Sequence, residues 1–239
     1  MTPFLAEIVG TMLLVVFGDG VVANVLLQKS KGQNSGWIVI ATGWALAVTF
    51  AVYAVSGLSQ SHFNPAVTLA AASIGRIAWG EVPGYIVAQM IGGFLGGVLV
   101  WVTYLPHWRL TEDKGLKLAV FCTGPAVRDP LSNLITEAIA TGFLVVGLLS
   151  VLRPANLGGS TGFAPLLVGL IVFAIGLSLG GPTGYAINPA RDLGPRIAHA
   201  VLPVAGKGGS DWGYAWIPVV GPIVGGIAGA LLYRALWGA

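Results

Sequence analysis

The stretch from Leu179 to Asp192 reads LGGPTGYAINPARD and lies between two long apolar segments. Its first half is rich in Gly, which is typical of a loop, and its second half begins a helix. Asn188 followed by Pro189 predicts the helix start, because the Asn oxygen accepts an orphan backbone N–H and Pro presets the first helical φ. The two N–H donors of the Asn188 amide should then face whatever lies in front of the helix.

The tripeptide Asn188-Pro189-Ala190 has an earlier copy, Asn64-Pro65-Ala66. One copy is weak support for any function, since many short helices begin in this way. The helix that the earlier copy starts should end near Ile74, which makes it too short to cross a bilayer. We therefore expect two re-entrant half-helices that are buried in protein.

The composition is that of a membrane protein. Of the 239 residues, 55% are hydrophobic and 9% are charged, against about a quarter charged in a soluble domain. Four uncharged runs reach the ~20 residues that span a bilayer, and two further apolar segments carry acids. The runs are Gly36–Leu58, Val82–Pro106, Pro154–Ala190 and Trp212–Tyr233, and the acid-bearing segments are Met1–Leu27, with Glu7 and Asp19, and Leu131–Leu152, with Glu137.

These segments predict an all-α membrane protein with six transmembrane helices and two re-entrant half-helices. The first segment lacks the basic start and the cleavage site of a secretory signal, so we expect it to remain as a helix. The single cysteine, Cys122, excludes an internal disulfide, and with three scattered histidines it offers no metal site. The net charge of +3 is spread over loops, which leaves no basic patch for nucleic acid.

The second half of the chain repeats the first. Glu7 and Thr11 match Glu137 and Thr141 at an offset of 130 positions, and the two Asn-Pro-Ala copies lie 124 positions apart. The glycine-rich segment that begins at Gly92 returns at Gly221. Matches in the same order at nearly one offset are hard to obtain by chance. We expect one domain, residues 1–239, with repeat halves 1–106 and 131–239 joined by a loop at 107–130.

Each half holds three spans and one half-helix, and an odd number of spans makes the second half enter the membrane from the opposite side. Such inverted repeats place a binding or conduction site at the midplane, between the N-termini of the broken helices. Both Asn-Pro-Ala ends should meet there. The glycine rows that begin at Gly92 and Gly221 predict close helix packing inside one subunit.

The paired motifs on half-helices within six spans resemble the aquaporin superfamily of major intrinsic proteins over essentially the whole chain. More narrowly, the chain resembles the aquaglyceroporins, or glycerol facilitators. Its marks are Asp192 and Arg196, where water-selective relatives usually carry small residues, and Pro218 at the start of the sixth span. The resemblance implies a passive channel for glycerol, other small neutral solutes and water, which excludes ions and protons, is not an enzyme and needs no cofactor. It also implies a homotetramer in the lipid of the cell membrane, with cytoplasmic termini.

The resemblance further implies the site residues. The selectivity filter would consist of Trp44, Gly176, Tyr185 and Arg191, and Tyr185 stands where Phe is the commonest residue of glycerol facilitators. The buried acids Glu7 and Glu137 would hold the two re-entrant loops, a role that we favour over a proton relay. Backbone carbonyls would line the path at Gln60, Ser61, His62 and Phe63 and at Gly184, Tyr185, Ala186 and Ile187.

The residue types of this filter suit a neutral polyol, whose hydroxyls lie along one edge of a carbon chain. Trp44 and Tyr185 offer an apolar wall, while Arg191 offers fixed donors and a charge that repels cations. Gly176 leaves room for the carbon chain. The half-helix N-termini, each equivalent to about half a positive charge, raise the energy of a cation between them.

The same sequence features leave alternatives to a glycerol channel. The main solute could instead be water, dihydroxyacetone, urea or a protonated small acid such as lactic acid, since all are neutral and narrow. An ion channel or coupled transporter would need charged groups in the middle, where the chain offers Asn. An intramembrane serine hydrolase is suggested by Gly176-Leu-Ser178-Leu-Gly180 with His199 downstream, but the segment lacks the strand-turn-helix of a nucleophile elbow.

The sequence also allows predictions for the three histidines and for the charged residues of the loops. We expect His62 to form hydrogen bonds at the path, His107 to lie in a loop, and His199 to lie in the second half-helix or a loop. The positive-inside rule alone would invert the protein relative to the family, and we follow the motifs. With cytoplasmic termini, the inner side holds Arg76, Arg153 and Arg234, while the outer loops hold Lys29, Lys31, Arg109, Lys114, Lys117, Arg128 and Lys207.

Overall fold

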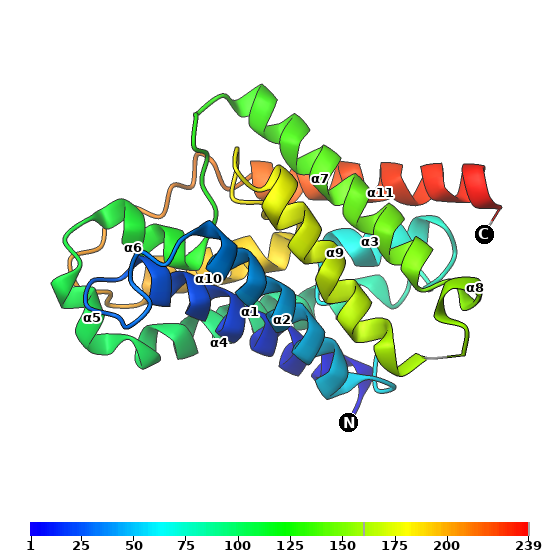
Figure 1. Ribbon diagram of the computed structural model, residues 1–239, viewed down its shortest axis with the longest axis horizontal. Coiled ribbons are helices and arrows are strands. Elements are labelled where there is room, and N and C mark those ends of the chain that lie inside the picture. The colour runs from blue at the N-terminus through cyan, green and yellow to red at the C-terminus, as the bar shows by residue number, and fades with distance from the viewer. Residues whose placement is uncertain (160, 239) are drawn as a thin grey trace.

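The computed structural model describes residues 1–159 and 161–238 and is built around six long helices (Figure 1). Each of them, α9 together with the turn before it, is long and apolar enough to cross a membrane. No strand forms in the described residues, so the prediction of an all-α fold with six spans is confirmed. The long helices are α1 (Pro3–Leu26), α2 (Trp37–Val55), α4 (Val82–Thr103), α7 (Pro130–Val151), α9 (Ala164–Leu179) and α11 (Ile217–Trp237).

Two half-helices follow the Asn-Pro-Ala copies. They are α3 (Pro65–Ser73) and α10 (Pro189–Val201), and each begins at the Pro after a capping Asn. Their 9 and 13 residues fall well short of a bilayer span, which needs ~20. Both are packed among the long helices, as expected for re-entrant segments.

The segments between spans contain more helix than the sequence predicted. The uncharged run Pro154–Ala190 begins with a short helix, α8 (Pro154–Leu157), and a turn, η1 (Thr161–Phe163), before α9 starts. The connection at 107–130, expected as a plain loop, contains most of α5 (Leu105–Leu110) and all of α6 (Lys114–Phe121). The carboxylate of Asp113 caps α6 by accepting the N–H groups of Gly115 and Leu116.

Each half-helix packs on the third span of the opposite half. α10 lies against α4, and α3 lies against α11. Glycine permits these approaches, because a Cβ on Gly93 would lie 2.5 Å from the Ala190 carbonyl oxygen and a Cβ on Gly226 would lie 3.1 Å from that of Ala66. The predicted close packing by the glycine rows is therefore present inside one chain, and it interlocks the two halves around the tips of α3 and α10.

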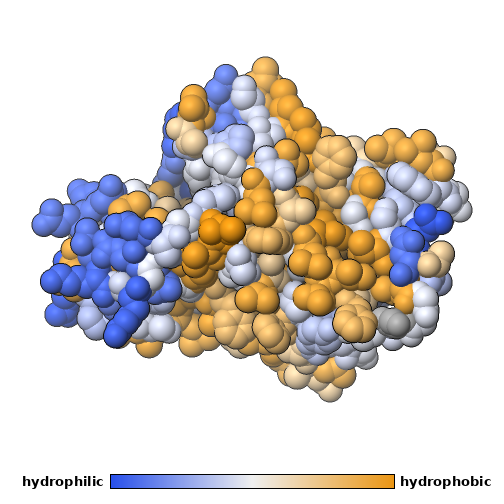
Figure 2. Space-filling view, viewed as in Figure 1, coloured by the Kyte–Doolittle hydropathy of each residue, from blue (hydrophilic) through white to orange (hydrophobic). Residues whose placement is uncertain are grey.

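The surface matches a protein embedded in lipid. Hydrophobic residues gather over the middle of the molecule, and hydrophilic residues gather at the left-hand end, near α5 and α6 (Figure 2). Outward side chains such as Phe50, Ile139 and Phe143 are about half exposed or more, an arrangement that is stable in hydrocarbon rather than in water. Both termini lie in the right-hand half of Figure 1, away from α5 and α6, as an even number of spans requires.

Candidate functional site

The two capping asparagines join the half-helices tip to tip. The Oδ1 atom of Asn64 accepts the Ala66 N–H at 2.9 Å, and that of Asn188 accepts the Ala190 N–H at 2.9 Å. Across the junction, Asn64 Nδ2 donates to the Ile187 carbonyl oxygen at 2.8 Å, while Asn188 Nδ2 donates to the Phe63 carbonyl oxygen at 2.8 Å.

This reciprocal bonding corrects one expectation. Both N–H donors of the Asn188 amide were expected to be free, but one of them is used to hold the opposite loop. The reason lies in the tertiary structure, because the repeat brings the loop before each half-helix against the cap of the other. One donor of each amide is left over among the hydrogen bonds of the described residues.

The loops that lead into the half-helices hold a strained backbone. Ser61 and Phe63 have φ of 53° and 50°, and Tyr185 and Ile187, at the matching positions of the second loop, have φ of 40° and 45°. Positive φ is unusual outside glycine and is a genuine outlier for a β-branched residue such as Ile187. Strain of this kind costs about 1–3 kcal/mol per residue and persists only where neighbours enforce it.

A buried carboxylate enforces the first loop. Glu7, on α1, is 0% exposed. Its Oε1 accepts the His62 N–H at 3.0 Å and the Ser59 hydroxyl at 2.8 Å. Its Oε2 accepts the Phe63 N–H at 2.9 Å and the Gln89 side-chain N–H at 2.8 Å. The charge is thus compensated by hydrogen bonds, each stronger for being made to an ion.

The second loop is held in the same way. Glu137, on α7, is also 0% exposed. It accepts the N–H groups of Ala186 at 2.9 Å and Ile187 at 2.8 Å, and the Thr183 hydroxyl at 2.6 Å. The two acids therefore occupy equivalent places in the two repeats. Both carboxylates accept hydrogen bonds from loop donors, and Glu7 also accepts one from Gln89 on α4, which leaves little capacity for a proton relay.

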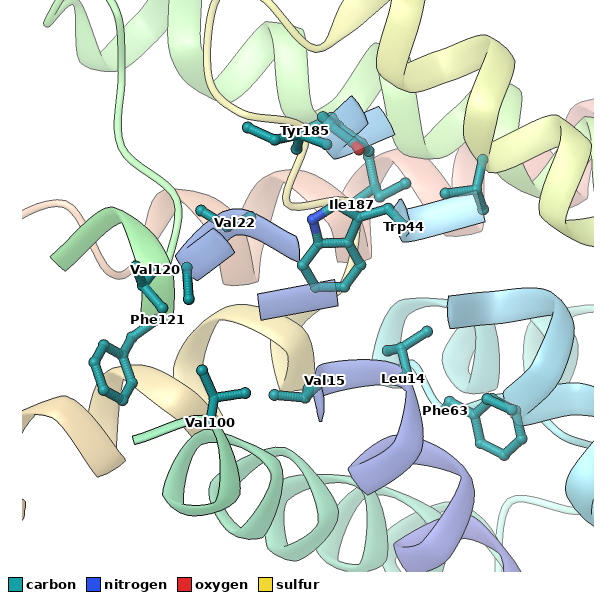
Figure 3. Close-up of a cluster of buried hydrophobic side chains, with 14 of the residues drawn as sticks. Leu14, Val15, Val22, Trp44, Phe63, Val100, Val120, Phe121, Tyr185 and Ile187 are labelled. Carbon is teal, nitrogen blue, oxygen red and sulfur yellow. The ribbon is translucent and has the colours of Figure 1, made fainter. Parts of the chain in front are cut away.

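A cavity of about 390 Å³ runs along both loops. Trp44, Tyr185 and Arg191 border it together with both capping asparagines, and side chains of α1, α2, α7 and α9 form an apolar wall, for example Val48, Val145 and Val172. Figure 3 shows Trp44 and Ile187 close together between Tyr185 and Leu14. Of the other predicted path residues, Gln60, Ser61, His62, Phe63, Ala186 and Ile187 border the cavity, while Gly176 and Gly184 are not among the described residues that do.

The guanidinium of Arg191 lies between an aromatic face and an acid. Its central carbon is 4.0 Å from the centre of the Trp44 ring, within the range of a cation–π contact. Its Nη1 is 3.3 Å from Oδ1 of Asp19, on α1. Arg191 is 7% exposed and Asp19 is 0% exposed. The sequence placed an acid in the first span, but it did not identify Arg191 as its partner.

Gly176 contributes through Tyr185. A Cβ on Gly176 would lie 2.9 Å from Cζ and 3.0 Å from Oη of Tyr185, so the ring occupies the space beside this glycine. The Tyr185 hydroxyl is buried and has no hydrogen-bond partner in the described part of the chain. Trp37, which the sequence did not single out, donates from Nε1 to the Gly176 carbonyl oxygen at 2.9 Å and meets the Tyr185 ring edge-on at 5.7 Å.

Asp192 and Arg196 form a second buried ion pair, one turn apart on α10. Arg196 Nε donates to Asp192 Oδ1 at 2.9 Å, and both side chains are 0% exposed. Asp192 Oδ2 accepts the backbone N–H and the hydroxyl of Thr123, each at 2.7 Å, while Arg196 donates to the carbonyl oxygens of Thr123 and Ser210. This pair anchors the connections at that end of the bundle to α10. Pro218 lies buried in the first turn of α11.

The histidines and Ser178 take separate positions. His62 borders the cavity, with Nδ1 3.1 Å from the Thr68 hydroxyl. His199 is buried on α10, with Nδ1 2.9 Å from the Ser210 hydroxyl, and His107 lies on α5 rather than in a loop. Ser178 lies in the last turn of α9, which ends at Leu179, so a helix rather than a strand precedes it and the strand-turn-helix of a nucleophile elbow is not formed there.

Comparison with known proteins agrees with this architecture. The family described as "Major intrinsic protein" matches residues 1–233. The probable glycerol uptake facilitator protein of Thermotoga maritima is 60% identical over 237 residues, which cover 99% of this chain and 100% of that protein. The glycerol uptake facilitator protein of Bacillus subtilis is 55% identical over 98% of this chain and 85% of its own length. The X-ray structure of the aquaglyceroporin from Plasmodium falciparum superposes with a TM-score of 0.87 at 30% identity, covering 98% and 95% of the two chains.

Proposed function

This chain belongs to the major intrinsic protein family, and on that basis we propose that it is a passive transmembrane channel for glycerol, water and other small neutral solutes. It is not an enzyme. Its similarity to two glycerol uptake facilitators at 55–60% identity favours glycerol as the main solute. The main alternatives differ only in the solute, which would be water, dihydroxyacetone, urea or a protonated small acid such as lactic acid.

One observation carries the proposal: one side of the cavity is polar and the other is apolar. Both strained loops with their capping asparagines border it, and an apolar wall of helix side chains borders it as well. Glycerol has hydroxyls along one edge and carbons along the other, so a polar strip beside an apolar wall fits it in extended form. A cation would lose its hydration in such a passage, and no acidic side chain is among the described residues that border it.

We assign the narrow, selective part of the path to Trp44, Gly176, Tyr185 and Arg191. Trp44 supplies a flat apolar surface, and the free N–H groups of Arg191 supply donors to passing hydroxyls. Gly176 matters because the Tyr185 ring rests against it. Any side chain at position 176 would push the ring, and the space lost would be space that a carbon chain needs.

The remaining site residues have supporting roles in this proposal. The half-helix N-termini at Asn64-Pro65-Ala66 and Asn188-Pro189-Ala190 each carry about half a positive charge, and together they disfavour cations and protons. The strained loops present backbone carbonyls to the solute, and Glu7 and Glu137 hold the loops in that shape. Asp192, Arg196 and Pro218 fix α10 and α11 around the filter. One channel domain is formed by residues 1–239, with halves 1–106 and 131–239 joined by 107–130.

The finer points of location and assembly are also proposals. The protein crosses the membrane several times, and we place it in the cell membrane. Both ends lie away from α5 and α6, and we assign that end of the bundle to the cytoplasm on the resemblance to the family. The apolar outer faces would contact lipid and three further copies in a homotetramer. Accessibility of terminal tags in intact cells tests the orientation, and the mass of the purified assembly tests the tetramer.

Stopped-flow permeability of proteoliposomes tests the function. The same batch is challenged in turn with glycerol, dihydroxyacetone, urea and lactic acid, and its water permeability is measured alongside. Glycerol should enter much faster than into empty liposomes, and a sodium gradient should be retained. Water permeability without any solute permeability would favour the water-channel alternative. Glycerol entry at the rate of empty liposomes would refute the proposed glycerol channel.

A further inference from the structure

Asp19 is a buried acid inside the first span that no role described so far accounts for. It lies on α1, is 0% exposed, and has Oδ1 3.3 Å from Arg191 Nη1. Its Oδ2 has no hydrogen-bond partner within residues 1–159 and 161–238. An ionisable residue at membrane depth is costly and usually functional. Unlike Glu7 and Glu137, Asp19 bonds no loop backbone among the described residues, so scaffolding does not explain it.

The neighbouring hydrogen bonds indicate that Asp19 is the ion-pair partner of Arg191. The neighbouring acid, Asp192, accepts hydrogen bonds from Thr123 on one oxygen and from Arg196 on the other. Arg196 in turn spends its donors on Asp192 and on backbone carbonyls. That pair is complete in itself, so the charge of Arg191 is balanced by Asp19 alone among the described acids that contact it.

Asp19 stands behind Arg191 as seen from the cavity. Arg191 and Trp44 border the cavity, whereas Asp19 is not among the described residues that do. The residue before it, Gly18, also shapes this corner, since a Cβ there would collide with the ring of Trp44. α1 therefore fixes both partners of the cation–π contact at once, with Gly18 admitting the ring and Asp19 holding the guanidinium.

We propose that Asp19 is a positioning residue of the selectivity filter, which holds the Arg191 guanidinium over the Trp44 ring and cancels its charge. The proposal rests on the proposed glycerol channel. With Asp19 ionised, one edge of the guanidinium is anchored and the remaining N–H groups point in fixed directions toward a passing polyol. The constriction then selects by donor geometry rather than by net charge. The main barrier to cations is then located at the half-helix tips.

Without Asp19, the guanidinium would lose its anchor and its counter-charge together. A free guanidinium can move into the passage, where it blocks a three-carbon solute more than it blocks water. The substitution Asp19→Asn keeps the shape of the side chain and removes the charge. We expect it to lower the ratio of glycerol to water permeability about fivefold, which corresponds to about 1 kcal/mol at 1.4 kcal/mol per tenfold.

A double-mutant cycle separates this role from a structural one. The ratio of glycerol to water permeability is measured in proteoliposomes for the parent, D19N, R191V and D19N/R191V. If Asp19 acts through Arg191, D19N changes the ratio in the parent and leaves it unchanged in the R191V background. Asp113→Asn is the matched control, because it makes the same substitution at an exposed helix cap where Asn serves as well as Asp.

Each result bears on the proposal. An unchanged ratio in folded D19N overturns it, and so does an equal change in both backgrounds. If D19N does not fold, D19V/R191V removes both buried charges together and should conduct with the ratio of R191V. A different ratio, or failure of that variant to fold where R191V folds, also overturns the proposal. A parent that passes no glycerol is a separate failure, that of the channel function itself.

Discussion

A methyl group at Gly176 should slow the passage of glycerol while leaving that of water nearly intact. The Cβ of Ala would lie 2.9 Å from Tyr185 Cζ, whereas carbon atoms in contact prefer about 3.5–4.0 Å. The ring must therefore retreat by about 0.6 Å or more. Trp37, which packs on the same ring at 5.7 Å and bonds the Gly176 carbonyl, limits the directions open to it, and the cavity offers the free space.

The size of the effect follows from the packing strain. Overpacking by one methyl group costs about 1–3 kcal/mol, and a ring that relieves this strain by moving into the cavity must be pushed back whenever a polyol passes. At about 1.4 kcal/mol per tenfold in rate, glycerol permeability should fall about 5-fold to 150-fold. The fold itself should survive, since replacing a helical Gly by Ala gains about 1 kcal/mol.

Paired measurements of glycerol and water permeability on one liposome batch provide the assay for Gly176→Ala. Gly84→Ala is the matched control, because it also changes a glycine within a helix and its Cβ would meet nothing within 4 Å. Adding Tyr185→Leu to Gly176→Ala should restore glycerol, since the ring that is displaced is then absent. Parental glycerol permeability in folded Gly176→Ala would refute the argument that Gly176 sets the position of the ring.

Three further predictions follow from the same contacts. Asn188→Asp places a carboxylate where two positive helix ends meet and should admit cations, as measured by sodium or proton flux under a gradient; a folded variant as tight as the parent would contradict the barrier at the tips. Glu137→Gln replaces an acceptor of the Ile187 N–H and should lower the free energy of unfolding in detergent by about 2 kcal/mol, and parental stability would argue against the carboxylate as the support of that loop. Trp37→Phe removes the donor to the Gly176 carbonyl, which should cost about 1 kcal/mol of stability and lower the ratio of glycerol to water permeability; an unchanged ratio would mean that the Tyr185 ring needs no support from that side.

The sequence predicted the helices well where the signal is local. An Asn before a Pro fixes a helix start whatever surrounds it, and both half-helices begin at the expected residue. The prediction failed in the connection 107–130, where α5 and α6 form. These helices are short and carry charged residues, so hydropathy could not reveal them, and they are stabilised in part by the packing of α6 on α1 and α10.

The residues that border the cavity could be predicted better than the residues that hold them in place. The resemblance to the family implied Trp44, Tyr185 and Arg191 as filter residues, and all three border one cavity. The neighbours that hold them were not predicted, because Asp19 lies 172 positions before Arg191 and Trp37 lies 139 positions before Gly176. Nothing in the chemistry of a single segment indicates which distant partner will meet it.

The sequence by itself determined the spans, the paired helix caps and the inverted repeat, since each depends on hydropathy or on bonds within a few residues. Only the tertiary structure decided that each half-helix seats on the opposite half, that each Asn holds the other loop, and that Asp19 balances Arg191. The physical reason is that lipid hydrocarbon offers no hydrogen bonds, so every buried polar group must be paired inside the protein. The packing of whole helices decides which of these groups meet. Patterns within a short stretch of sequence do not show how distant helices will pack.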